Sequence, residues 1–165
     1  MKVLGIDPGM RVMGYGVIEE SDQRLAMLDC GTFTALAHTP VAERLHELYL
    51  GVKEIIGRYQ PEEVAIEEPF VARNARSALA VGRAQAAAML AAAEQGIPVC
   101  CYAPTQVKQS VTDYGGSGKE QVQEMVRIQL GLDQTPQPSD AADALAVALC
   151  HLQQTHLARL LGEHR

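Results

Sequence analysis

Four acidic residues stand at the ends of apolar segments, where a charge is costly unless it has a partner. Asp7 ends the first apolar run of GIDPGMRVMGYGV (residues 5–17), and Glu67 ends the short run VAIE. In PSDAADALAVALCH, Asp140 and Asp143 are three residues apart, so a helix places both on one face. Carboxylate oxygens of this kind suit Mg²⁺ or Mn²⁺ rather than zinc.

Each acid also has a simpler interpretation. Asp7 precedes Pro8 and Gly9 and fits the chemistry of a turn. Acids in the first turn of a helix, here with Ser139 as the expected N-cap, are stabilised by the helix dipole. Two acids that end neighbouring strands, however, lie about 5 Å apart at the backbone and repel each other unless a divalent cation joins them. Four acids from three elements therefore predict a site for two metal ions, which would promote attack of water on a phosphodiester.

The elements that must position these acids alternate in type along the chain. Apolar runs over residues 3–7, 12–19 and 25–34 predict three strands joined by short connections, and hence an antiparallel meander. Two further strands are expected over residues 64–67 and 99–103, and helices over residues 41–58, 75–95, 104–115, 119–130 and 140–161. This order predicts an α/β fold with a five-stranded mixed sheet, helices on both faces, and the fourth strand parallel to the first and beside it.

Composition sets the broad class of the protein. A chain of 165 residues suits one domain, expected over residues 1–158 with a C-terminal tail over 159–165. The net charge of -6 argues against a nucleic-acid partner, although local patches of charge matter more than the sum. The four cysteines form no CxxC pair, and Cys100 and Cys101 point to opposite faces of an expected strand. We expect free thiols, no membrane span and a cytoplasmic location.

Four segments together resemble a known family: GIDPGMRVMGYGV, AIEEPFVARNARSALAVGRA, QVKQSV and DAADALAVALCH. In this order and spacing they closely resemble RuvC, a family of bacterial Holliday-junction resolvases in the RNase H-like nuclease superfamily. The resemblance covers residues 1 to about 156. It implies an RNase H-like fold and a homodimer that binds a four-way DNA junction and makes two symmetric nicks with Mg²⁺ or Mn²⁺. It also implies work beside the RuvA–RuvB branch-migration complex in recombination and DNA repair.

The resemblance implies roles for particular residues. The family's catalytic, metal-binding acids match Asp7, Glu67, Asp140 and Asp143, although some relatives carry histidine in place of the last acid. Lys108 and Lys119 match lysines near the scissile phosphate. The helix over residues 75–95 corresponds to the family's dimer interface, while its alanine-rich composition fits equally well a helix that packs only on the sheet.

Three more residues are candidate DNA contacts. Phe70 follows Pro69, and because the family has an aromatic residue in this loop we interpret the ring as stacking on an unpaired base rather than as a half-buried loop residue. Arg73 and Arg76 follow closely. Arg76 either meets a phosphate over the acidic site or lies on a solvated helix edge. Because basic residues are few and must share one face, we expect strongly salt-dependent junction binding.

Three features have a structural interpretation as well as a functional one. His151 follows Asp143 by two helical turns, about 12 Å, which is too far to share a metal and favours a structural role. Gly14 and Gly16 let a strand pass close to DNA or to its neighbours, or mark a bulge. The loop GGSG before Lys119 is not a Walker A motif, since Glu120 occupies the Ser/Thr position, so no nucleotide site is predicted.

Three other functions compete with junction resolution. A nucleotide-binding enzyme of the actin or sugar-kinase type needs a second domain for which this chain is too short. A DNA-binding module with a decayed site is disfavoured by four intact acids. Another RNase H-like nuclease that acts on RNA or on non-junction DNA is the main alternative. A comparison of four-way DNA junctions with linear duplex and RNA–DNA hybrid separates it from a resolvase.

Overall fold

One five-stranded sheet organises the chain. The computed structural model describes residues 1–22, 24–36, 38–69 and 74–162. The strand order is β3-β2-β1-β4-β5, with the antiparallel meander on one side of the central strand and the parallel strands on the other, as predicted. The strands are β1 (Lys2–Asp7), β2 (Val12–Ser21), β3 (Arg24–Thr34), β4 (Glu63–Glu67) and β5 (Val99–Tyr102).

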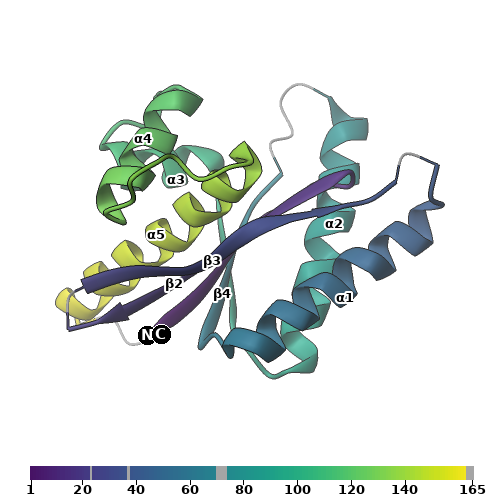
Figure 1. The fold of residues 1–165 in the computed structure, drawn as a ribbon, viewed down its shortest axis with the longest axis horizontal. Coiled ribbons are helices and arrows are strands. Elements are labelled where there is room, and N and C mark those ends of the chain that lie inside the picture. Colours follow the sequence, from purple (N-terminus) through teal and green to yellow (C-terminus); the bar gives the residue numbers. More distant parts are fainter. Residues whose placement is uncertain (23, 37, 70–73, 163–165) are drawn as a thin grey trace.

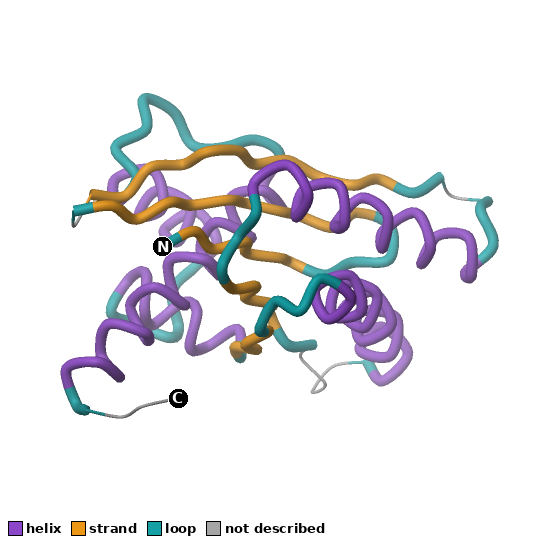
Figure 2. The backbone as a smooth tube through the Cα atoms, turned by 90° about the horizontal axis from the view of Figure 1, so that it is seen from below, coloured by secondary structure: helices purple, strands orange, loops and turns teal. Residues whose placement is uncertain are grey.

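Helices cover both faces of the sheet (Figure 1). On one face lie α1 (Val41–Tyr59) and α2 (Ala75–Glu94), which also pack on each other. The other face is covered by α5 (Ser139–Leu160), against which the shorter helices α3 (Pro104–Thr112) and α4 (Lys119–Gln129) pack. Figure 2 shows the strands as one layer between the two groups of helices. The predicted α/β fold, a mixed sheet flanked on both faces, is confirmed.

The face under α1 and α2 is built from large aliphatic side chains. Alternate residues of β1 and β4 point towards it, and α1 meets them with apolar residues at helical spacing. Fully burying one such side chain contributes about 1.5–3 kcal/mol. The principal members of this cluster are Leu4, Ile6, Val17, Leu48, Val52, Ile56, Val64 and Ile66, with alanines of α2.

The face under α5 is built differently, because glycines bring backbone against backbone. A Cβ atom at Gly5 would lie 2.1 Å from the carbonyl oxygen of Ala144, and one at Gly14 would lie 2.0 Å from that of Asp140. A Cβ at Gly16 would lie 2.6 Å from the side chain of Leu145. Gly14 and Gly16 therefore pass close to a neighbouring element, α5, rather than marking a bulge. The register shift of β2 against β3 falls further along the strand, between Val17 and Ile18.

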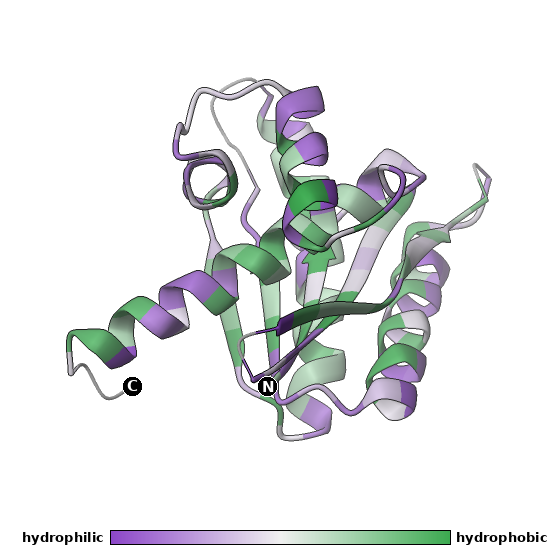
Figure 3. Ribbon diagram, turned by 60° about the vertical axis from the view of Figure 1, so that its left-hand side comes forward, coloured by the Kyte–Doolittle hydropathy of each residue, from purple (hydrophilic) through white to green (hydrophobic). Residues whose placement is uncertain are grey.

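The ends of α5 differ from the sequence expectation. Ser139 is the first helical residue and not the N-cap, a position that Pro138 takes with an extended backbone and no side-chain cap. A serine that already has helical backbone angles cannot cap its own helix, so the expected Ser139 cap is wrong. At the other end the helix ends at Leu160, one residue before the predicted end at residue 161. Its last turns extend beyond the sheet (Figure 3) and expose Leu157 and Leu160.

Two further expectations can be compared with the structure. Cys100 packs in the cluster under α5 and Cys101 in the cluster under α1 and α2, so the two thiols do point to opposite faces. All four cysteines are free. Among the described residues, no helix has both the length and the apolar character that a membrane span requires.

Candidate active site

The acids of β1, β4 and α5 meet at one edge of the sheet. β1 and β4 are parallel with Ile6 opposite Ile66, so the next residues, Asp7 and Glu67, end their strands side by side. Asp7 also pairs with Gly14, whose Cα faces the backbone of Asp140. The glycine contact therefore places the first turn of α5 directly over the end of β1.

A pocket of about 200 Å³ opens at this edge. Three of the acids, Asp7, Glu67 and Asp143, line it, and Asp140 lies close enough for its charge to act on Asp7. Its remaining lining residues are Pro104, Val107, Lys108, Lys119, Val122 and Ala146. A larger hollow of about 520 Å³ lies elsewhere, near Met1 and His156, and its lining contains none of the four acids.

Burial and mutual repulsion strongly raise the pKa values of Asp7 and Glu67, the two acids that end strands. Burial, followed by the charges of Glu67, Asp143 and Asp140, raises the pKa of Asp7 to about 8. Burial and the charge of Asp143 raise the pKa of Glu67 to about 7, against the opposing charges of Lys108 and Lys119. The carboxylates gathered here therefore carry more negative charge than Lys108 and Lys119 neutralise.

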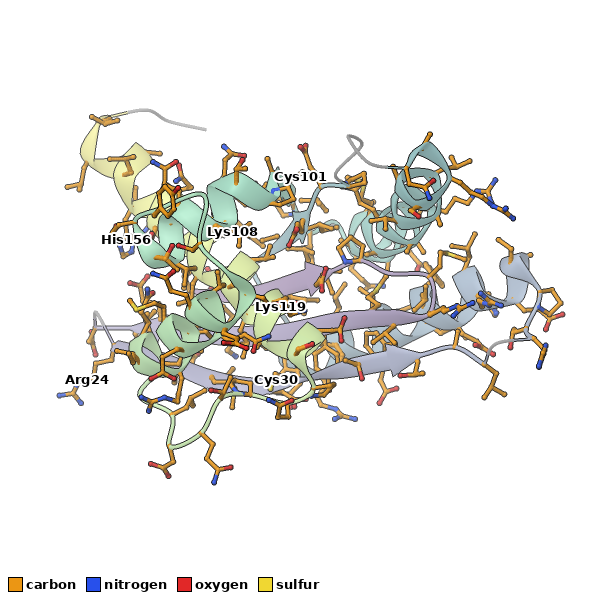
Figure 4. All side chains as sticks on the ribbon, turned by 90° about the horizontal axis from the view of Figure 1, so that it is seen from above. Arg24, Cys30, Cys101, Lys108, Lys119 and His156 are labelled. Carbon is orange, nitrogen blue, oxygen red and sulfur yellow. The ribbon has the colours of Figure 1, made fainter. Side chains whose placement is uncertain are left out.

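Two lysines enter the pocket from α3 and α4. The Lys119 ammonium lies 2.6 Å from Oδ2 of Asp143 and is half-exposed. Burial disfavours its charge, but the hydrogen bond to Asp143 and the charges of the neighbouring acids outweigh this and raise the pKa of Lys119. Lys108 lines the same pocket from α3. Figure 4 shows both lysines on the side of the molecule that α3 and α4 occupy.

A pair of hydroxyl groups fixes the loop between these lysines. The Thr112 hydroxyl lies 2.8 Å from the carbonyl oxygen of Lys108 and 2.7 Å from the hydroxyl of Ser117, which is only 3% exposed. Thr112 lies one turn after Lys108, and Ser117 lies two residues before Lys119. The hydrogen bond therefore ties together the two segments that carry the lysines. Sequence reasoning missed this pair, because isolated Ser and Thr residues near a glycine-rich loop give no signal.

The remaining sequence candidates lie apart from the pocket or cannot be placed. Phe70 and Arg73 fall outside the described residues. Arg76 lies exposed in the first turn of α2, and within the described residues no ion pair joins its side chain to the acids. His151 is buried away from the pocket, where it contacts Tyr102 and Glu63.

The donor set of the pocket fits a divalent cation with a preference for oxygen. All four acids offer carboxylate oxygens, which are the ligands that Mg²⁺ and Mn²⁺ prefer. The raised pKa values of Asp7 and Glu67 point the same way, since a bound cation would relieve the repulsion that raises them. A mixed sheet of this order, with acids from two parallel strand ends and one helix in a single pocket, defines an RNase H-like nuclease.

Comparison with known proteins gives the family. The model of the family described as crossover junction endodeoxyribonuclease RuvC matches residues 3–151. The RuvC of Chloroflexus aggregans is 52% identical over 151 residues, 92% of both chains, and that of Dehalococcoides mccartyi is 48% identical over 99% of this chain and 98% of the relative. A structure of Thermus thermophilus RuvC in complex with a Holliday junction substrate matches with a TM-score of 0.89 and 40% identity over 96% of each chain. The chain belongs to the RuvC family of crossover junction endodeoxyribonucleases, and it is a hydrolase that cuts DNA.

Proposed function

We propose that the acidic pocket is the catalytic centre with which this chain resolves four-way DNA junctions. The observation that carries this proposal is the convergence of Asp7, Glu67 and Asp143, with Asp140 beside them, in a pocket that also holds two lysines. Family membership supports the substrate, since the related Thermus thermophilus RuvC has been solved with a Holliday junction. The products would be two symmetric nicks in strands of like polarity.

The four acids would hold Mg²⁺ or Mn²⁺, with two ions in each site. When bound, such ions lower the pKa of water and stabilise negative charge on phosphate oxygens. Asp7 and Glu67 supply half-buried carboxylates. Because their pKa values are raised, protons compete with the ions, and ion binding becomes more favourable as the pH rises. Asp140 and Asp143, one helical turn apart, complete the donor set from the opposite wall of the pocket.

The lysines and the apolar wall have separate tasks in this proposal. Lys119 pairs with Asp143 in the pocket. It would meet the scissile phosphate, where its charge would offset the negative charge that develops during cleavage. Lys108 would act in the same way from α3. Val107, Val122 and Ala146 line the pocket with apolar surface, which strengthens electrostatic interactions within it by excluding water.

Contacts with the rest of the junction belong to the same proposal. Phe70 would stack on an unpaired base, and Arg73 and Arg76 would meet phosphates. Two symmetric nicks require two active sites, so we infer a homodimer through α2, on which Leu79 and Leu90 are 57% and 64% exposed. We also infer a cytoplasmic protein that works beside the RuvA–RuvB complex, with residues 1–158 as its nuclease domain.

A comparison of substrates tests the function. We expect the purified chain with Mg²⁺ or Mn²⁺ to cut a four-way DNA junction at paired positions, and to leave a linear duplex of the same sequence and an RNA–DNA hybrid largely uncut. Asp7→Asn should still bind the junction in a gel-shift assay but should not cut it. Preferential cutting of the hybrid would instead support the alternative of an RNase H-like nuclease acting on RNA.

A further inference from the structure

A second cluster of metal-ligating side chains lies on the α5 face of the sheet, at the other end of β4 from the acidic pocket. It consists of Glu63, Cys100 and His151, and one ligand atom from each lies within 4.8 Å of the others. Glu63 is the first residue of β4 and Glu67 the last, so the strand separates the two sites by about 13 Å. This cluster shares no residue with the acidic pocket.

The sheet register explains why these residues meet. Cys100 pairs with Ala65 across β4 and β5, and both point towards α5. Glu63 points the same way, because it lies two residues before Ala65 on the same strand. His151, in the middle of α5, reaches the same place from the helix and is completely buried. Three elements that are distant in sequence therefore each contribute one donor.

The His151 ring is held at both of its nitrogen atoms. Its Nδ1 lies 2.8 Å from the hydroxyl oxygen of Tyr102, and its Nε2 lies 2.8 Å from Oε2 of Glu63. In the tautomer that donates the Nδ1 hydrogen to Tyr102, the lone pair of Nε2 faces Glu63 and Cys100. A histidine that binds a metal through one nitrogen is characteristically held by a hydrogen bond from the other.

We propose that Glu63, Cys100 and His151 form a binding site for Zn²⁺ or a similarly soft divalent ion. A thiolate, an imidazole and a carboxylate are the donors that zinc takes, whereas the all-oxygen acidic pocket suits Mg²⁺ or Mn²⁺. Glu63 is 30% exposed, so water can reach the cluster and supply a fourth ligand. The ion would cross-link α5 to β4 and β5, and β4 and α5 also carry the acids of the pocket. This proposal does not depend on the function of the acidic pocket.

Cobalt spectroscopy on the full chain tests the site directly, because Co²⁺ replaces Zn²⁺ and reports a bound thiolate. The chelator-treated protein is titrated with Co²⁺ in excess Mg²⁺, which competes with Co²⁺ for sites made only of oxygen ligands. We expect a thiolate-to-cobalt charge-transfer band that saturates at one ion per chain and that Zn²⁺ abolishes by displacement. Cys101→Ser is the matched control, since its side chain points to the opposite face, and it should keep the band that Cys100→Ser loses.

Glu63→Gln provides a second variant, at a partly exposed position where glutamine keeps the size and shape of the side chain. It should weaken Co²⁺ binding by at least about tenfold, while the circular-dichroism spectrum stays that of the parent. Zn²⁺ should also raise the melting temperature of the parent, and should do so less for Cys100→Ser. The proposal is overturned if the parent gives no thiolate band, or if Cys100→Ser retains it.

Discussion

The two faces of the sheet are packed by different means, and the acidic pocket lies on the α5 face. Under α1 and α2, leucine and isoleucine side chains interlock, and such a layer can repack around a change in volume. Under α5, Gly5 and Gly14 set strand backbone directly against helix backbone. Asp7, Asp140 and Asp143 come from elements joined in this second way, and Glu67 ends the neighbouring strand β4. We infer from this contrast that close backbone packing fixes the first turn of α5, and with it Asp140 and Asp143, relative to the end of β1.

The sharpest test of this contrast uses two neighbouring acids. Glu67 lines the pocket on the α5 face, whereas Glu68 is exposed and does not line it. We expect Glu67→Gln to lower the rate of junction cleavage by about 1,000-fold, because the pocket loses a charge that would hold the metal. The cleavage rate of Glu68→Gln should stay within a few-fold of that of the parent. Cleavage assays at saturating Mg²⁺ measure both, and similar losses in the two variants would contradict the assignment of the faces.

Two glycine substitutions test whether the backbone contact on the α5 face is needed for stability. Gly14→Ala would place a Cβ atom 2.0 Å from the carbonyl oxygen of Asp140, so we expect it to lower the free energy of unfolding by about 3 kcal/mol. Gly57 lies in α1 with no atom within 4 Å of the equivalent position. Gly57→Ala should instead stabilise the protein by up to about 1 kcal/mol through helix propensity.

Urea unfolding of both glycine variants gives the two values. Because Gly14 faces the turn of α5 that carries Asp140, Gly14→Ala should also reduce cleavage, whereas Gly57→Ala should not. A Gly14→Ala variant as stable as the parent would show that α5 can move away from β2 without penalty.

The raised pKa values of the pocket acids predict that the free energy of unfolding of the metal-free protein depends on pH. The pKa of Asp7 rises from 3.8 to about 8 and that of Glu67 from 4.5 to about 7, so between these values the folded state binds more protons than the unfolded chain. The contribution of these groups to the free energy of unfolding is therefore present at low pH and falls as the pH rises to about 8. The slope is at most about 1.4 kcal/mol per pH unit for each proton.

Urea unfolding with a chelator at pH 5 and pH 8 measures this effect. Asp7→Asn removes the largest shift and should flatten the dependence relative to the parent. Added Mg²⁺ should restore stability at the higher pH, where the acids are ionised. Equal pH profiles for the parent and Asp7→Asn would mean that Asp7 is not protonated in the folded protein.

The smallest expected effect concerns the hydroxyl pair that ties the lysine segments. Thr112→Val removes the hydroxyl that Ser117 contacts, and Ser117→Ala removes one that Thr112 contacts. We expect each substitution to lower the free energy of unfolding by about 1 kcal/mol. The double variant should cost less than the sum of the two, because both polar groups are then gone. Strictly additive effects, measured by urea unfolding, would show that the two hydroxyl groups do not interact.

The sequence by itself determined the elements and the identity of the acids. Apolar periodicity is a local property, and it located the five strands and five helices of the described residues. The order of these elements then predicted that β4 lies beside β1, as it does. The short motifs around Asp7, Glu67 and Asp140 then indicated the family. Local pattern failed at the start of α5, where Ser139 resembles a cap but already belongs to the helix.

Only the tertiary structure decided how those elements meet. Gly14 and Asp140 lie far apart in the chain, and nothing near either residue shows that one makes room for the other. The same holds for the pairing of Lys119 with Asp143 and for the meeting of Glu63, Cys100 and His151. The physical reason is that strand and helix periodicity depends on neighbours within a few residues, whereas the approach of α5 to the sheet depends on side-chain volume summed over elements that only folding brings together.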